Sequence, residues 1–179
     1  MSVESSGELA GRVAFVTGAT RGIGRAIALA LADAGGTVVG TATTDEGAAS
    51  ITGYLSAAAG KGEGVRLDVR DAAATDAVVR DVESRHGPIA ILVNNAGVTR
   101  DNLLVRMKDD EWDAIMDTNL KPAFRLAKLV LRGMMKARRG RIIQIGSVVG
   151  SSGNSGQANY AAAKAALVGF TKSLALEVA

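Results

Sequence analysis

The sequence predicts an α/β fold, a single doubly wound domain of Rossmann type whose helices cover both faces of a parallel sheet. Short apolar runs alternate with helical stretches along the 179 residues, and such spacing calls for right-handed crossovers between parallel strands. A glycine-rich turn follows the first apolar run, as in dinucleotide-binding domains. With 22 glycines and 3% aromatic residues, the core is expected to consist of small and branched aliphatic side chains.

The first half of the chain contains two strand–helix pairs. Residues 12–17 (RVAFVT) are a short apolar run, and residues 22–34 carry apolar side chains three or four positions apart, which predicts a helix. Residues 37–41 (TVVGT) are β-branched and predict a second strand. Residues 45–59 are rich in alanine and predict the second helix.

The pattern continues through the middle of the chain. Residues 64–68 (GVRLD) predict a third strand and residues 71–85 a third helix, and residues 89–94 (IAILVN) predict a fourth strand. A long helix is expected over residues 109–138. Because Pro122 has no N–H to donate to the carbonyl four residues earlier, we expect a kink in this helix.

The last expected strand covers residues 141–147 (RIIQIGS), and the last helix covers residues 158–178. Residues 149–157 between them are rich in Gly, Ser and Asn, which predicts a loop. Since no internal repeat or linker interrupts the pattern, residues 1–179 are expected to form one dinucleotide-binding domain.

Composition excludes several classes of function. The net charge is +3, from 21 basic and 18 acidic residues, and with so few aromatic side chains no nucleic-acid partner is expected. The chain has no cysteine and a single histidine, His86, so no metal site, disulfide or Ser-His-Asp triad is expected. No apolar run approaches the ~20 residues of a membrane span, and the polar residues 1–11 do not resemble a signal peptide. A cytoplasmic location is therefore expected.

A glycine-rich motif, TGATRGIG, joins the first strand to the first helix. Its glycines would permit a tight turn (Gly18), the approach of backbone N–H groups to a pyrophosphate (Gly22) and close helix–strand packing (Gly24). A purely structural turn is the alternative, but the position between a strand and a helix favours cofactor binding. The expected contacts are Gly18, Thr20, Arg21, Gly22, Ile23 and Gly24.

The end of the second strand favours NADP(H) over NAD. NAD enzymes usually place an acid about 20 residues after the glycines, where it binds the ribose 2′-hydroxyl. This chain has Thr41 there, and its first acid is Asp45. We expect Arg21 to face a 2′-phosphate, with Thr41 or Thr43 donating a hydroxyl.

The next two strands also end in polar residues. Asp68 and the following Val69 are expected to contact adenine, although Asp68 is also a suitable helix N-cap. Asn95, Ala96 and Gly97 follow the fourth strand at the edge of the sheet where ligands bind. Turn chemistry is the alternative for these three residues.

Three residues form a candidate catalytic set. Tyr160 and Lys164 are four positions apart on a predicted helix and share one face. A free phenol has a pKa of ~10, and a nearby ammonium lowers it, so Lys164 could activate Tyr160 as an acid while Ser147 holds a carbonyl oxygen. Alone, a Tyr-x-x-x-Lys pair more commonly means surface packing beside a solvated lysine. Both residues are also expected to contact the cofactor.

Asn119 is a fourth candidate because it lies three residues before Pro122. We hypothesise that the opened helical turn holds a water that links Asn119 to Lys164 as a proton path. The alternative is a polar residue tolerated beside a kink that serves packing alone.

These motifs and their order resemble the short-chain dehydrogenase/reductase family over nearly the whole chain. Residues 97–112, 134–150 and 156–179 resemble the 3-oxoacyl-[acyl-carrier-protein] reductases of type II fatty-acid synthesis. The resemblance implies NADPH-dependent reduction of 3-oxoacyl thioesters to (3R)-3-hydroxyacyl products during fatty-acid elongation. It makes Tyr160 the acid and Ser147 the carbonyl orienter. Lys164 would bind ribose and modulate the pKa of the tyrosine, and Asn119 would be the relay.

The resemblance also implies partners. Acidic carrier protein docks on basic residues in that family, and Arg132 falls at a matching position within the basic cluster of residues 132–141. The alternative is an ordinary solvated helix end. The family usually forms tetramers through the helices expected at 109–138 and 158–178, and through a C-terminal strand and helix expected to be missing from this chain together with a substrate lid.

Two other functions remain open on the sequence. One is a related reductase that acts on acetoacetyl-CoA or another ketone. The other is a truncated, non-catalytic NADP-binding module.

Overall fold

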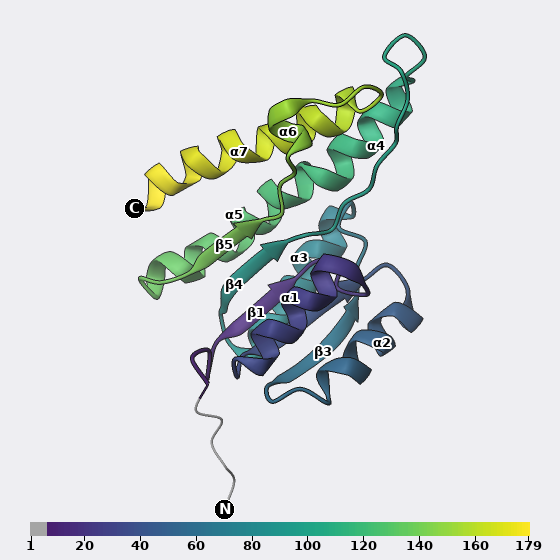
Figure 1. Cartoon of the computed structure of the whole chain (residues 1–179). Helices are drawn as coiled ribbons and strands as arrows, with labels where there is room; N and C mark the ends of the chain where they lie inside the picture. The colour runs from purple at the N-terminus through teal and green to yellow at the C-terminus, as the bar shows by residue number, and fades with distance from the viewer. Residues whose placement is uncertain (1–6) are drawn as a thin grey trace, which may run out of the picture.

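The computed structural model describes residues 7–179 as a five-stranded parallel sheet in the order β3-β2-β1-β4-β5 (Figure 1). The strands are β1 (Val13–Val16), β2 (Thr37–Ala42), β3 (Lys61–Arg66), β4 (Ile89–Asn94) and β5 (Arg141–Gln144). The helices are α1 (Gly22–Asp33), α2 (Asp45–Leu55), α3 (Ala72–His86), α4 (Asp109–Asn119), α5 (Lys121–Lys136), α6 (Val149–Ser152) and α7 (Ala158–Val178). The doubly wound α/β prediction is confirmed. The start of the polar N-terminal segment, residues 1–6, lies outside the described residues.

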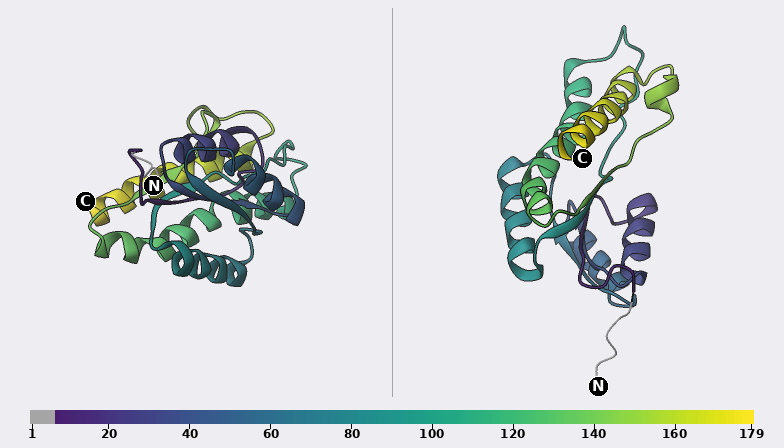
Figure 2. Two further views of the ribbon diagram at one scale, coloured as in Figure 1. Left: turned by 90° about the horizontal axis from the view of Figure 1, so that it is seen from below. Right: turned by 90° about the vertical axis from the view of Figure 1, so that its left-hand side faces the viewer.

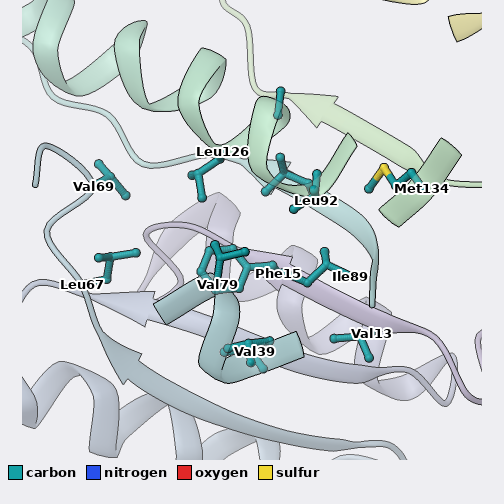
Figure 3. Close-up of a cluster of buried hydrophobic side chains, with 13 residues drawn as sticks. Val13, Phe15, Val39, Leu67, Val69, Val79, Ile89, Leu92, Leu126 and Met134 are labelled. Atoms are coloured by element: carbon teal, nitrogen blue, oxygen red, sulfur yellow. The ribbon is translucent and has the colours of Figure 1, made fainter. Parts of the chain in front are cut away.

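Helices cover both faces of the sheet, as the two views in Figure 2 show. On one face, small residues of α1 such as Ala28 and larger ones of α2 such as Ile51 pack on Val16 of β1. On the other face, α3 and α5 pack on Phe15 of β1 through Val79 and Leu126, which Figure 3 labels. The order of the strands reverses between β1 and β4, and the carboxyl ends at such a reversal form the usual ligand crevice.

The third strand lies further toward the N-terminus than predicted, and two of its glycines serve packing. A Cβ at Gly62 would lie 2.7 Å from the Val38 carbonyl oxygen, and one at Gly64 would lie 2.0 Å from the Ala48 oxygen. These glycines let β3 approach β2 and α2. The predicted strand at residues 64–68 was wrong in its bounds, because β3 spans Lys61–Arg66.

The predicted helix at residues 109–138 is two helices, and the expected kink near Pro122 is confirmed. The break falls at Leu120 (φ −117°, ψ −58°), and Pro122 lies in the first turn of α5, where its missing N–H has no helical partner to lose. The predicted loop at residues 149–157 was wrong in part, because it begins with the short helix α6.

Candidate active site and nucleotide cleft

A cleft of about 760 Å³ opens at the carboxyl ends of β1, β2 and β4. It is lined by every residue predicted from the first four strands to contact a cofactor: Gly18, Thr20, Arg21, Gly22, Ile23, Gly24, Thr41, Asp68, Val69, Asn95, Ala96 and Gly97. Residues that sequence reasoning did not select also line it, among them Arg70 and Arg100.

The glycine loop is shaped by positive φ angles and by one close approach. Gly18 (φ +65°) and Gly22 (φ +56°) adopt the left-handed region that favours glycine. A Cβ at Gly24 would lie 2.3 Å from the Gly18 oxygen and 2.5 Å from Asn95 Nδ2. Gly24 therefore packs against the loop itself, a tighter constraint than the helix–strand packing that we expected.

Thr17 and Asn95 stabilise the glycine loop through hydrogen bonds. Thr17 Oγ1 accepts hydrogen bonds from the backbone N–H groups of Asn95 and Ala96, both at 2.9 Å. Asn95 Nδ2 donates to the carbonyl oxygens of Thr17 (2.9 Å) and Gly18 (3.0 Å). Sequence reasoning missed Thr17, although a hydroxyl residue at the end of β1, directly before Gly18, was a usable signal.

Thr41 supports the loop instead of presenting its hydroxyl to the cleft. Its side chain is 1% exposed, and its Oγ1 accepts from the Gly18 N–H at 3.2 Å. Arg21 and Thr43 are exposed residues that line the cleft. The nearby acid, Asp45, forms an ion pair with Arg66 at 3.0 Å.

Asp68 lines the cleft and is paired with Arg70. The guanidinium of Arg70 lies 2.5 Å from Asp68 Oδ2, and its hydrogen bond to Asp68 lowers the pKa of that carboxyl. The alternative role of Asp68 as a helix cap is wrong, because Asp71 caps α3 by accepting from the Ala74 N–H at 2.9 Å. Asp68 therefore lines the cleft without capping the helix.

Two of the candidate catalytic residues, Tyr160 and Lys164, lie together on α7, and Lys164 reaches the segment that follows β5. Lys164 is 5% exposed, and its Nζ donates to the Ile145 carbonyl at 2.6 Å and lies 5.6 Å from the centre of the Tyr160 ring. Burial lowers the pKa of Lys164. Ser147 follows β5, and its Oγ accepts from the Val149 N–H at 3.2 Å.

Asn119 ends α4 and is 3% exposed. Its Oδ1 accepts from the Val98 N–H at 2.8 Å, and its Nδ2 donates to the Val98 carbonyl at 2.9 Å. The side chain therefore fixes the segment that follows β4. Its water link to Lys164 remains a prediction.

Asn159 is a buried polar residue that sequence reasoning missed. Its side chain is fully buried, donates to the carbonyls of Arg100 (2.9 Å) and Glu111 (3.3 Å), and accepts from the Tyr160 N–H at 2.8 Å. It ties the start of α7, next to Tyr160, to α4. Its position in the first helical turn gave no signal, because such residues are usually solvated caps.

Within residues 7–179, no cluster of potential metal ligands is found. In the same part of the chain, none of the helices combines the length and apolarity needed to cross a bilayer. Arg132 is exposed on α5.

Residues 12–179 match the family model of short chain dehydrogenases. The chain is 59% identical over 171 residues to a protein named 3-oxoacyl-[acyl-carrier-protein] reductase FabG from Vibrio harveyi, covering 96% of this chain and 69% of that protein. It is 60% identical over 169 residues to the protein of the same name from Escherichia coli (strain K12), covering 94% and 68%.

A solved structure described as a putative short-chain alcohol dehydrogenase from Sinorhizobium meliloti 1021 superposes with a TM-score of 0.90 at 40% identity. The match covers 94% of this chain and 67% of that one. The chain thus spans a little over two thirds of the length of these proteins. On fold, motifs and identity, it belongs to the short-chain dehydrogenase family of oxidoreductases.

Proposed function

We propose that this chain reduces 3-oxoacyl-[acyl-carrier-protein] to the (3R)-3-hydroxyacyl product with NADPH, as a step of fatty-acid elongation. One observation carries the proposal. Tyr160 and Lys164 lie together on α7, Lys164 is bonded to the segment that leads from β5 to Ser147, and the glycine loop lines a cleft, in a chain about 60% identical to reductases of that name.

The cleft fits a nicotinamide dinucleotide. The loop leaves no room for a side chain at Gly24, where a Cβ would lie 2.3 Å from the Gly18 oxygen. Arg21 makes no side-chain cap on α1, so the first-turn N–H groups are available to a pyrophosphate. Asp68, which lines the cleft, would accept from the adenine amino group, and Asn95 holds the loop through its two hydrogen bonds. When bound, the cofactor would supply the hydride.

Three features favour NADP(H) over NAD. Arg21 is exposed at the cleft and can pair with a 2′-phosphate. Thr43, rather than the buried Thr41, offers an exposed hydroxyl. The carboxylate of Asp45, which could otherwise bind a ribose 2′-hydroxyl, is held by Arg66.

Side chains of this chain would supply the proton that the ketone oxygen gains in the reduction. The Ser147 hydroxyl orients the ketone oxygen, and the Tyr160 phenol donates its proton to that oxygen as the carbon is reduced, which leaves a phenolate. The Lys164 ammonium, near the Tyr160 ring, stabilises the phenolate. A water held beside Asn119 would return a proton to the site.

The same proposal includes partners. Acidic carrier protein would dock near Arg132, because opposite charges steer such encounters. Exposed apolar side chains on α5 and α7, Phe124 (55%) and Val168 (46%), favour a homo-oligomer through these helices.

The test compares acetoacetyl-carrier protein, acetoacetyl-CoA and a simple ketone as substrates, with NADPH consumption followed by absorbance and the product's configuration determined by chiral chromatography. We expect the highest kcat/KM for the carrier-bound thioester and a (3R) product. A preference for the CoA thioester or the ketone would instead assign the chain to another reductase of the family. Binding of NADPH without turnover of any substrate would identify a binding module.

A further inference from the structure

Tyr54 of α2 reaches the glycine loop, although it takes no part in the site described so far. Its hydroxyl donates to the Ala19 carbonyl at 2.8 Å, across 35 positions of sequence. A phenol with a pKa of about 10 is protonated at neutral pH and burial raises the pKa of Tyr54 further, so its hydroxyl acts as a donor. Because this half-buried hydroxyl contacts a single carbonyl of the glycine loop, we expect it to affect the conformation of the loop at that point.

Other backbone groups of the loop also have hydrogen-bond partners within the protein. The carbonyls of Thr17 and Gly18 are satisfied by Asn95, and the N–H groups of Gly18 and Ala19 are taken by the side chain and carbonyl of Thr41. The Ala19 carbonyl is the next group along the chain, and Tyr54 is its donor. Each of these groups is therefore turned into the protein.

The peptide that joins Ala19 to Thr20 is the point where the loop turns to the cleft. In a trans peptide the C=O and the N–H point in opposite directions, and the protein has no cis peptide among its described residues. Fixing the Ala19 oxygen on Tyr54 therefore aims the Thr20 N–H away from α2. Thr20 lines the cleft.

A second contact holds the Tyr54 ring. The guanidinium of Arg25, one turn along α1, lies 5.0 Å from the centre of the ring, within the range of a cation–π interaction. Arg25 thereby joins α1, whose N-terminus faces the cleft, to α2. Removing only the hydroxyl of Tyr54 would leave this contact in place.

We propose that Tyr54 is a positioning residue for the pyrophosphate half of the cofactor site, because its hydroxyl holds the Ala19–Thr20 peptide with the N–H toward the cleft. Without that donor the peptide is free to rotate and present the Ala19 oxygen, which repels a phosphate. This inference rests on the proposed binding of NADPH and adds a residue outside the cleft to it.

The test is Tyr54→Phe, measured with two ligands by fluorescence titration and competition. NADPH carries a pyrophosphate, whereas 2′-AMP fills only the adenosine and 2′-phosphate part of the cleft. A lost hydrogen bond of about 1 kcal/mol predicts an NADPH dissociation constant about fivefold higher. The constant for 2′-AMP should stay within about twofold of wild type. With a 3-oxoacyl substrate, the KM for NADPH should rise while kcat is kept.

Thr52→Val is the matched control, because it removes a hydroxyl of α2 that bonds to the Gly64 N–H instead of the loop. We expect it to leave both dissociation constants unchanged. Wild-type affinity for NADPH in Tyr54→Phe would overturn the inference alone. An equal rise of the dissociation constants for NADPH and 2′-AMP in both variants would overturn it too. Wild-type protein that binds neither ligand would overturn the proposed function, and the inference with it.

Discussion

The part of the molecule from β1 to β4, here called the nucleotide half, differs in burial and in polar contacts from the part formed by β5, α6 and α7, here called the catalytic half. Each residue of β1 is buried, whereas the edge strand β5 alternates between exposed and half-buried residues. The glycine loop is held by Thr17, Thr41, Tyr54 and Asn95. Of the candidate catalytic residues, Ser147 follows the edge strand β5, and Tyr160 and Lys164 lie on α7, which packs beside α4, away from the centre of the sheet (Figures 1 and 2).

The two halves therefore differ in how firmly the chain fixes its functional groups. In the catalytic half, a groove of about 650 Å³ runs between α5, β5 and α7, and apolar side chains such as Ile143 (42%) and Leu176 (84%) are exposed. The catalytic half has fewer polar anchors, chiefly Lys164 on Ile145 and Asn159 beside Tyr160. Changes in the nucleotide half should alter cofactor affinity and stability, and changes in the catalytic half should alter turnover.

Tyr160→Phe should give the largest effect. Loss of a positioned acid is expected to lower kcat by a factor of about 10² to 10⁴, while the NADPH dissociation constant stays within about twofold. Stopped-flow turnover and fluorescence titration measure the two quantities. A variant that kept most of its turnover would remove Tyr160 from the chemistry, and one that lost NADPH affinity instead would abolish the contrast between the halves.

Arg21→Ala should act on cofactor choice. A hydrogen bond to a charged group contributes about 1.5–3 kcal/mol, so the affinity for NADPH should fall at least about tenfold while that for NADH is unchanged. Arg80→Ala is the control, because Arg80 is exposed and pairs with Asp76 on α3 at 2.7 Å. An equal loss for NADPH and NADH would show that Arg21 does not read the 2′-phosphate.

Gly24→Ala and Gly53→Ala should change the stability of the protein in opposite directions. A Cβ at Gly24 would meet the Gly18 oxygen at 2.3 Å, whereas a Cβ at Gly53 on α2 has nothing within 4 Å. We expect Gly24→Ala to lower the free energy of unfolding by about 1–3 kcal/mol and Gly53→Ala to raise it by about 1 kcal/mol. Urea unfolding measures both, and a stable Gly24→Ala would contradict the close approach.

Lys164→Met should change how stability depends on pH. Burial disfavours the ammonium, so the pKa of Lys164 is lowered from 10.5, and the folded state is penalised below that lowered pKa. The penalty fades as pH rises through the lowered pKa and is absent above 10.5. The stability of the variant relative to wild type should therefore shrink over this window. Urea unfolding across the window checks this, and a difference independent of pH would refute it.

Sequence reasoning succeeded where a pattern is local. The alternation of strands and helices, the glycine loop and the kink at Pro122 each follow from a few neighbouring residues. It failed where a residue's task depends on distant partners. Thr41 is bound to Gly18, Asn159 joins α7 to α4, and the glycines of β3 pack on α2, and none of these contacts leaves a periodic signal in the sequence.

The proposed catalytic function is tested most directly by the initial rates of acetoacetyl-carrier protein reduction with NADPH and with NADH, on the 179-residue chain. The account predicts turnover with NADPH and a kcat/KM for NADH at least about tenfold lower, as expected when a charged contact to the 2′-phosphate is missing. A folded chain that binds NADPH but reduces nothing, or that uses both cofactors equally well, would contradict it.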